Sequence, residues 1–365
     1  MLKLFEISGF KNFKDTVCLD FSDVRDYKFN AQCISNDLIG KAIIYGKNAI
    51  GKSNFGLALF DIVSHLSSKN VTPNLYDYYL NVESPNDFAA FHYVFQFDES
   101  ILDYYYHKDE KQTLIYEKLV MNSTVLYEYD YSNHRGTTHG IKELAPTLNW
   151  AFQETDCILK YVINNTVLDD QHPLRRMMRF VNNMLWFRSL NENRYIGFKS
   201  QSNDYHDFMY EEATLSEFEV LLRASGIEDG LTVRTNADGK KTLYFDTETP
   251  LPFFRVASNG TRALYTFFYW YKTAKDVSFM FIDEFDAFYH FELAESIVSI
   301  LEKMSNTQVV LTSHNTNLLT NKIMRPDCYF ILTKDKLTSL ANATTRELRE
   351  GHNLEKLYMS GEFNG

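Results

Sequence analysis

The segment IIYGKNAIGKSNFGLALF, residues 43–60, decides the fold class of this chain. A short apolar run ends at Gly46, and Gly51, Lys52 and Ser53 follow at the spacing G-x-x-x-x-G-K-[ST]. Glycine permits backbone angles that a side chain forbids, so the N–H groups of such a loop can turn toward phosphate oxygens. The pattern predicts a phosphate-binding loop for ATP, with Lys52 on the β and γ phosphates and the Ser53 hydroxyl on Mg²⁺. The loop residues expected to contact the nucleotide are Gly46, Lys47, Asn48, Ala49, Gly51, Lys52, Ser53 and Asn54.

Composition and charge narrow the class of protein. The chain has 365 residues, 45% of them hydrophobic, with a formal net charge of −11. A protein that wraps DNA with its whole surface is usually basic, so any contact with nucleic acid is expected to be local, indirect or absent. The four cysteines are far apart and form no metal-binding pair, and neither a signal peptide nor a membrane-spanning run is expected. These features favour a cytoplasmic protein with free thiols and no membrane partner.

Hydrophobic periodicity predicts an α/β core. Apolar positions at helical spacing predict a helix from Lys52 to about Ser68, directly after the phosphate loop. Two further helices are expected at 261–274 and 291–304, between strand candidates. Short apolar or alternating segments predict core or flanking strands at 2–8, 16–22, 41–45, 277–283, 307–313 and 328–334.

Two segments are expected to interrupt this core. Aromatic and β-branched residues over 88–131 predict an antiparallel meander. Residues 145–225 are expected to be mainly helical, with the clearest helical segments at 172–187 and 214–226, and no coiled-coil heptads are present. The expected parts are an N-terminal ATPase lobe at 1–145, a small helical insertion at 146–230 and a C-terminal ATPase lobe at 231–365.

Three further motifs contain the residue types of a nucleotide-hydrolysing site. Asp283 ends the apolar run SFMFID, where it would hold Mg²⁺, and Glu284 could polarise the attacking water as a catalytic base. His314 follows the strand candidate VVLTS and could hydrogen-bond the γ-phosphate. Ser258 and Gly260 in ASNGTRAL would present a hydroxyl and a backbone N–H to phosphate at a helix start. Taken singly, an acidic strand end, a structural histidine and a helix cap would also explain these residues.

The order of the four motifs is more informative than any one of them. The phosphate loop comes first, the Ser-x-Gly element follows much later, and the Asp-Glu pair and the histidine come last. This order resembles that of the ABC-type ATPase superfamily. The resemblance implies a head-to-tail homodimer in which each ATP lies between one phosphate loop and the partner's Ser-x-Gly element. Larger assemblies built from such dimers are compatible with it.

The two ends of the chain indicate a branch of this superfamily. LFEISGFKNFKD resembles the opening of RecF- and SMC-like proteins, which implies that Lys11 and Asn12 lie near the nucleotide, although a plain β turn has the same pattern. The segment 344–365 and the meander resemble small bacterial AAA-type, ABC-like ATPases of the RloA/AbiLi group, relatives of the ATPase subunit of the PARIS anti-phage system. Such proteins are typically encoded beside a toxic protein. The resemblance implies a sensor or switch subunit of an abortive-infection, toxin–antitoxin-like defence system, controlling a co-encoded effector such as a nuclease.

The chain departs from the usual family pattern in two places. S-N-G-T-R replaces L-S-G-G-Q, and DEFDAFYH has Phe285 where a proline is usual, so a D-loop role for Asp286 is a hypothesis. Gln96 matches the Q-loop residue that would couple Mg²⁺ to the second lobe, and a strand residue facing solvent is the alternative interpretation.

Two other functions stay open at this stage. A RecF-like ATPase of DNA repair could bind duplex DNA through the cationic positions of HPLRRMMRF, which are Arg175, Arg176 and Arg179. A solvated helix face would explain the same arginines. A stand-alone regulatory NTPase is the third possibility.

Overall fold

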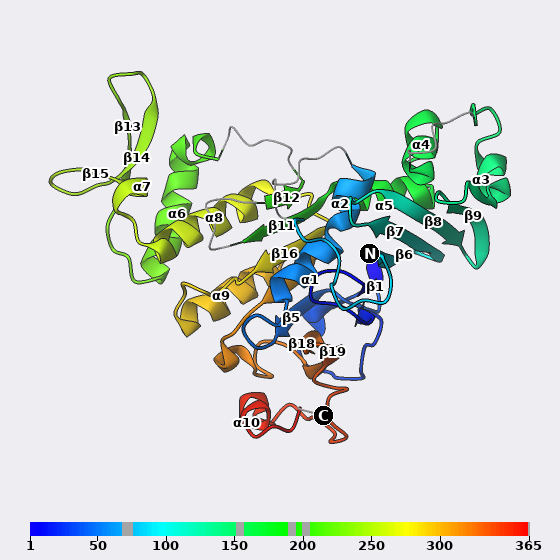
Figure 1. Ribbon diagram of the computed structural model, residues 1–365. Helices are drawn as coiled ribbons and strands as arrows, with labels where there is room; N and C mark the ends of the chain where they lie inside the picture. Colours follow the sequence, from blue (N-terminus) through cyan, green and yellow to red (C-terminus); the bar gives the residue numbers. More distant parts are fainter. Residues whose placement is uncertain (68–75, 151–156, 189–194, 199–204, 364–365) are drawn as a thin grey trace.

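Two seven-stranded sheets and a three-stranded sheet make up most of the fold (Figure 1). The computed structural model describes residues 1–67, 76–150, 157–188, 195–198 and 205–363. The core sheet lies between the other two, which extend to opposite ends of the molecule (Figure 1). The α/β core with an antiparallel lobe that the sequence predicts is confirmed, and within the described ranges the longest helix has fifteen residues, too few for a long coiled coil.

The core sheet has the strand order β12-β11-β16-β17-β5-β18-β19. Its inner strands run parallel to one another, and the two outer strands are antiparallel to their neighbours. Every residue of β5, β16 and β17 is buried, as expected for parallel strands covered on both faces. The strands are β5 (Lys41–Tyr45), β11 (Met184–Arg188), β12 (Tyr195–Gly197), β16 (Phe279–Asp283), β17 (Gln308–Thr312), β18 (Tyr329–Leu332) and β19 (Leu337–Ser339).

The second large sheet is antiparallel and confirms the meander expected over 88–131. Its order is β10-β9-β8-β7-β6-β1-β2, so the N-terminal strand joins the meander at one side. Alternating buried and half-buried side chains along β7 are typical of such a sheet. The strands are β1 (Leu2–Ser8), β2 (Val17–Asp20), β6 (Phe88–Phe97), β7 (Ser100–Asp109), β8 (Leu114–Met121), β9 (Thr124–Asp130) and β10 (Arg135–Thr137).

The helix after the phosphate loop connects the two large sheets. It packs against both β1 and β16, and the Phe55 ring meets Phe5 edge-on at 5.5 Å between centroids. The single helix expected to reach Ser68 divides at Phe60, whose φ of −93° and ψ of 0° end the first helix. The two pieces are α1 (Lys52–Leu59) and α2 (Asp61–Leu66).

The remaining elements cover or extend these sheets. The helices are α3 (His139–Leu144), α4 (Ile158–Asn165), α5 (Pro173–Asn182), α6 (Glu212–Ala224), α7 (Phe253–Val256), α8 (Asn259–Thr273), α9 (Phe291–Glu302) and α10 (Leu354–Met359). The short strands are β3 (Ile34–Ser35), β4 (Leu38–Ile39), β13 (Leu231–Thr235), β14 (Lys241–Phe245) and β15 (Leu251–Pro252). The 3-10 turns are η1 (Ala31–Cys33), η2 (Asp207–Tyr210), η3 (Thr316–Leu318) and η4 (Pro326–Cys328). Within the described ranges, no helix is long and apolar enough to cross a membrane.

One expected helix is corrected by the structure. The helix predicted over 172–187 ends at Asn182, and the following residues form the core strand β11. The first four residues of β11, the apolar run MLWF, are buried. Such a short apolar run has no periodicity that distinguishes a helix from a strand. The core sheet therefore takes strands from all three expected parts of the chain, and the segment 146–230 is not a purely helical insertion.

Candidate nucleotide-binding site

The parallel strands of the core sheet end in polar residues at one edge. Arg188 lies in register with Asp283 at the ends of β11 and β16, and Thr312 lies opposite Ile44 near the ends of β17 and β5. The phosphate loop begins directly after β5. In open α/β sheets, ligands bind outside the carboxyl ends of the strands. Motifs far apart in the sequence therefore meet where such a site is expected.

The phosphate loop needs its two glycines. A Cβ added to Gly46 would lie 2.9 Å from the Leu332 carbonyl oxygen, so the close approach of the two backbones excludes a side chain. Gly51 has a φ of +113° and precedes the first residue of α1. Lys52 is buried, and its ammonium donates to the Gly46 carbonyl at 2.8 Å, which keeps it folded over the loop. Burial also lowers the pKa of Lys52.

Thr312 connects the Asp283 carboxylate with the backbone of Glu284 at the end of β16. Its hydroxyl donates to Asp283 Oδ1 at 2.8 Å and accepts from the Glu284 N–H at 2.7 Å. Asp283 is fully buried, and burial raises its pKa, while the hydroxyls of Ser53 and Thr312 beside it oppose that rise. Among the described residues, the buried oxygen Asp283 Oδ2 has no hydrogen-bond partner.

The oxygen atoms at this point fit a Mg²⁺ ion. Mg²⁺ prefers one or two carboxylates and hydroxyl, water or phosphate oxygens. Asp283 offers a buried carboxylate oxygen without a hydrogen bond, and the Ser53 hydroxyl lies close enough to lower the pKa of that carboxyl. The roles expected for Asp283 and Ser53 in metal binding are compatible with this geometry.

Arg188 was missed by the sequence analysis. Its guanidinium Nη2 lies 2.7 Å from Glu284 Oε2, and its Nε lies 3.5 Å from Asp283 Oδ2. The sequence signal was a cation directly after the apolar run MLWF, but that run was assigned to a helix. Glu284 itself has a φ of 50°, which is uncommon outside glycine.

A cleft of about 730 Å³ opens in front of the phosphate loop. Its size is in the range of small-molecule sites. His314 lies on its wall with Nδ1 3.4 Å from the Lys52 ammonium, and burial together with the Lys52 charge lowers the pKa of His314. The loop side of the cleft is formed by residues 48–54, and the facing side includes Asn12, Glu284, Asp286, Tyr289, His314 and Asn315.

The comparison with known protein families agrees with this site. Residues 41–320 match the family described as "AAA domain, putative AbiEii toxin, Type IV TA system". The chain belongs to this AAA family. AAA domains are P-loop ATPase domains, so membership implies that the chain binds a nucleotide, usually with Mg²⁺. The match begins at β5 and ends just after η3, so it includes all four motifs.

Solved structures similar to this AAA-family chain include SMC head domains. An SMC head bound to the C-winged helix domain of ScpA has 15% identity and a TM-score of 0.47, over 93% of this chain and 97% of that one. The SMC head domain from Thermotoga maritima has 14% identity and a TM-score of 0.43, over 93% and 98% of the two chains. An SMC head with an extended coiled coil, bound to a ScpA domain derived from Pyrococcus furiosus, has 14% identity and a TM-score of 0.47, over 93% and 96%. None of the curated proteins matches the chain at a significant level.

The Ser-x-Gly element of the AAA-family chain lies outside its own cleft. Ser258 is an exposed residue that precedes α8, and its hydroxyl accepts from the Thr261 N–H at 3.1 Å and lies 2.8 Å from the Thr261 hydroxyl. A Cβ on Gly260 would lie 3.0 Å from the Phe288 carbonyl oxygen, so this helix start packs closely on the loop that follows Glu284. Neither Ser258 nor Gly260 lines the cleft.

Two expected contacts with the nucleotide site are corrected. Gln96 pairs with Ile101 near the end of β6, while Ala90 of the same strand pairs with Ser8, just before the loop that reaches the cleft. Six residues of strand separate them by roughly 20 Å. Gln96 is therefore not placed to bind the metal, because it lies near the end of β6 that is distant from the cleft.

The side chains of Lys11 and Asn12, in the loop between β1 and β2, make different contacts. Asn12 lines the cleft and accepts a hydrogen bond from the Asn54 amide. Lys11 has a φ of 44°, and its ammonium donates to the Asp77 carbonyl rather than lining the cleft. The structure thus brings the Asn12 side chain, but not that of Lys11, to the wall of the cleft.

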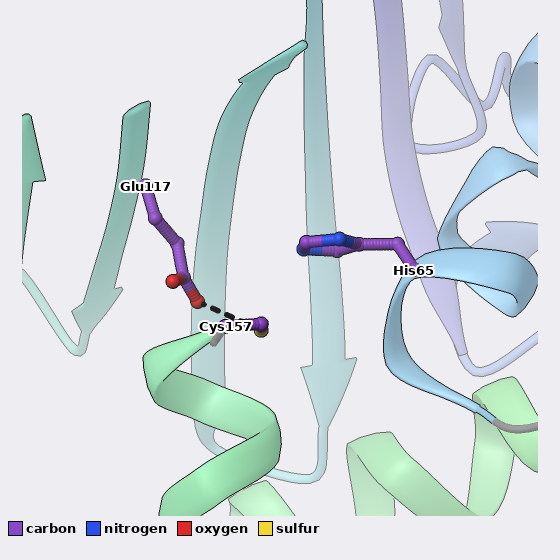
Figure 2. Close-up of side chains that lie close together, drawn as sticks. All are labelled: His65, Glu117 and Cys157. Carbon is purple, nitrogen blue, oxygen red and sulfur yellow. Dashed lines mark hydrogen bonds between the residues drawn. The ribbon is translucent and has the colours of Figure 1, made fainter. Parts of the chain in front are cut away.

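A second polar cluster lies apart from the cleft, between α2, β8 and the start of α4 (Figure 2). Donor atoms of His65, Glu117 and Cys157 lie within 4.8 Å of one another, which is a spacing compatible with a metal. The Glu117 oxygens, however, already accept from the Ile158 N–H at 2.9 Å and the Leu159 N–H at 3.2 Å. They also accept from the Cys157 thiol and from the hydroxyls of Tyr104, Tyr127 and Tyr131. The cluster is explained as a buried carboxylate that holds the start of α4 on the antiparallel sheet.

Proposed function

We propose that this chain binds and hydrolyses ATP as an ABC-type ATPase and works as the switch subunit of a defence system. The main support is that Lys52 and Glu284 line one cleft and that the buried Asp283 lies directly behind it, next to Ser53 and Glu284, although these residues come from distant segments. His314 joins them from a third segment. Chance placement of a phosphate loop would not bring a metal-binding carboxylate and a second acid to the same edge of the sheet.

Each residue has a chemical role that follows from its contacts. Bound ATP would supply the γ-phosphoryl group that the water attacks, with ADP as the leaving group, and Mg²⁺ would supply a cation that offsets the phosphate charge. Ser53 and Asp283 would hold the cation, and Lys52 would exchange the Gly46 carbonyl for phosphate oxygens. Glu284 would accept a proton from water, while Thr312 fixes its backbone N–H.

The proposed active form is a head-to-tail dimer. The support is that Ser258 and Gly260 begin a fifteen-residue helix yet lie outside the cleft of their own protomer. The hydroxyl of an exposed serine and the N–H groups of a helix start are suited to bind phosphate from a second chain. The dimer would place these groups on the partner's nucleotide.

The proposed biological role is control of a co-encoded effector, such as a nuclease, in an anti-phage system of the abortive-infection kind. The family description includes a putative toxin and a type IV toxin–antitoxin system. The sequence resemblance to RloA/AbiLi ATPases supports the switch role, since those proteins are typically encoded beside a toxic partner. In this role ATP would close the dimer, and its hydrolysis would release or activate the effector.

The first test uses Glu284→Gln. We expect this variant to bind ATP normally, to lose nearly all turnover and to accumulate as a dimer, because the water loses its proton acceptor. Phosphate release measures turnover, and light scattering with size-exclusion chromatography measures mass with and without ATP. Normal turnover would remove Glu284 from its role, and a strictly monomeric ATP-bound variant would contradict the dimer.

The second test addresses the partner. Co-expression with the protein encoded next to this chain is expected to give a complex whose stability changes with ATP. A RecF-like function would instead give duplex DNA binding that weakens steeply with salt. The structure offers that alternative less support, because Arg176 ion-pairs with Asp98, and Arg175 lies 3.8 Å from Asp170.

A further inference from the structure

Arg188 makes the closest ion pair at the proposed active site. Its side chain is 29% exposed, and it contacts the fully buried Asp283 and the half-buried Glu284. Two of its nitrogens, Nη2 and Nε, lie 2.7 and 3.3 Å from the same oxygen, Glu284 Oε2. The cation is thus held at both carboxylates of the hydrolytic motif.

The position of the guanidinium on Asp283 is the more informative contact. Arg188 Nε lies on the side of Asp283 Oδ2, the oxygen that lacks a hydrogen bond among the described residues. The other oxygen, Oδ1, is occupied by Thr312. Asp283 Oδ2 is therefore the oxygen with the most free acceptor capacity for a metal ion, and it already faces Arg188.

Arg188 and a divalent cation cannot both pair closely with the same oxygen of Asp283. Lys52 and Arg188 are the cations near Asp283 and Glu284 in the described part of the chain. Lys52 is engaged by the Gly46 carbonyl, so Arg188 provides the direct ion pairs. A divalent cation would repel the guanidinium and would compete with it for the same carboxylate.

We infer that Arg188 is an internal counter-ion which holds Asp283 and Glu284 in the nucleotide-free site and competes with the divalent cation for Asp283. It is a positioning residue, because it keeps Glu284 paired until the metal displaces the guanidinium. This inference rests on the proposed ATP site and adds a regulation of that site. Hydrolysis of bound ATP would then also require the metal, since Glu284 is freed only when the metal displaces the guanidinium.

The test measures metal affinity without hydrolysis. Mn²⁺ alone is titrated into the full-length wild-type protein, Arg188→Ala and Arg188→Lys, and free Mn²⁺ is followed by electron paramagnetic resonance. Arg188→Ala is expected to bind Mn²⁺ on the order of tenfold more tightly, because an opposite charge this close shifts a carboxylate's proton affinity by about one pKa unit or more. Arg188→Lys should fall between the two, since a point charge cannot reproduce the forked contact.

Two controls separate competition from a general change of charge. Arg175→Ala removes an exposed cation elsewhere and is expected to leave Mn²⁺ affinity unchanged. In an Asp283→Asn background, Arg188→Ala should no longer tighten binding. Thermal unfolding of each variant establishes that it is folded.

The outcomes distinguish this inference from the proposed function. Unchanged, weaker or unmeasurable Mn²⁺ binding in a folded Arg188→Ala variant would overturn the competition, whatever the ATPase activity. Tightening that persists with Asp283→Asn would overturn the assignment to Asp283. Absence of ATP binding by the wild-type protein would instead overturn the proposed ATPase.

Discussion

Replacing Glu117 by glutamine tests whether the buried cluster in Figure 2 is a structural brace. Glu117 is fully buried and accepts hydrogen bonds from two backbone N–H groups at the start of α4, those of Ile158 and Leu159. An amide of the same shape offers one acceptor oxygen, and its NH₂ group would face donors. Tyrosine hydroxyls can rotate to accept from it, but a backbone N–H cannot.

The expected cost follows from these contacts. A buried donor left without an acceptor costs about 1–3 kcal/mol, and hydrogen bonds to a neutral acceptor are weaker than those to a carboxylate. Together these effects predict that Glu117→Gln lowers the free energy of unfolding by about 2–4 kcal/mol. Urea denaturation followed by circular dichroism, in buffer containing EDTA, measures the change.

A matched control is available on the neighbouring strand. Glu128 also accepts from a tyrosine hydroxyl, that of Tyr116, but its side chain is 42% exposed and pairs with Lys118. Glu128→Gln should cost less than about 1 kcal/mol, because exposed ion pairs contribute little. Equal effects of the two substitutions would refute the brace. If EDTA alone destabilised the wild-type protein as much as Glu117→Gln does, the cluster would be a metal site instead.

Two further predictions concern pH and the hydrolytic motif. Burial lowers the pKa of His107 to about 4 from an unfolded value near 6.5, so its contribution to stability is complete above pH 6.5 and is lost as pH falls toward 4. His107→Phe should therefore flatten the loss of melting temperature over that interval, and an unchanged pH profile would contradict the assignment. Thr312→Val should lower the free energy of unfolding by about 2 kcal/mol and reduce ATP turnover, because it removes the hydroxyl between Asp283 and Glu284. Thr312→Ser keeps that hydroxyl and should retain most of both, as measured by denaturation and phosphate release.

The phosphate loop and the strands around it could be predicted from the sequence. A loop that turns backbone N–H groups inward needs glycine at specific positions, and Gly46 and Gly51 meet that need through local geometry alone. The strand at 41–45 and the meander over 88–131 were also predicted, since burial on both faces and alternating burial leave different patterns.

The partners of the hydrolytic residues depended on tertiary structure. Arg188 lies in register with Asp283, although the two are distant in the sequence, and the run before it has no period that identifies a strand. Gln96 has the residue type of a metal contact, yet its position along β6 takes it away from the cleft. The backbone angles that a loop needs are determined by the residue types in the loop itself. The register between strands that are distant in the sequence is determined only when the sheet forms.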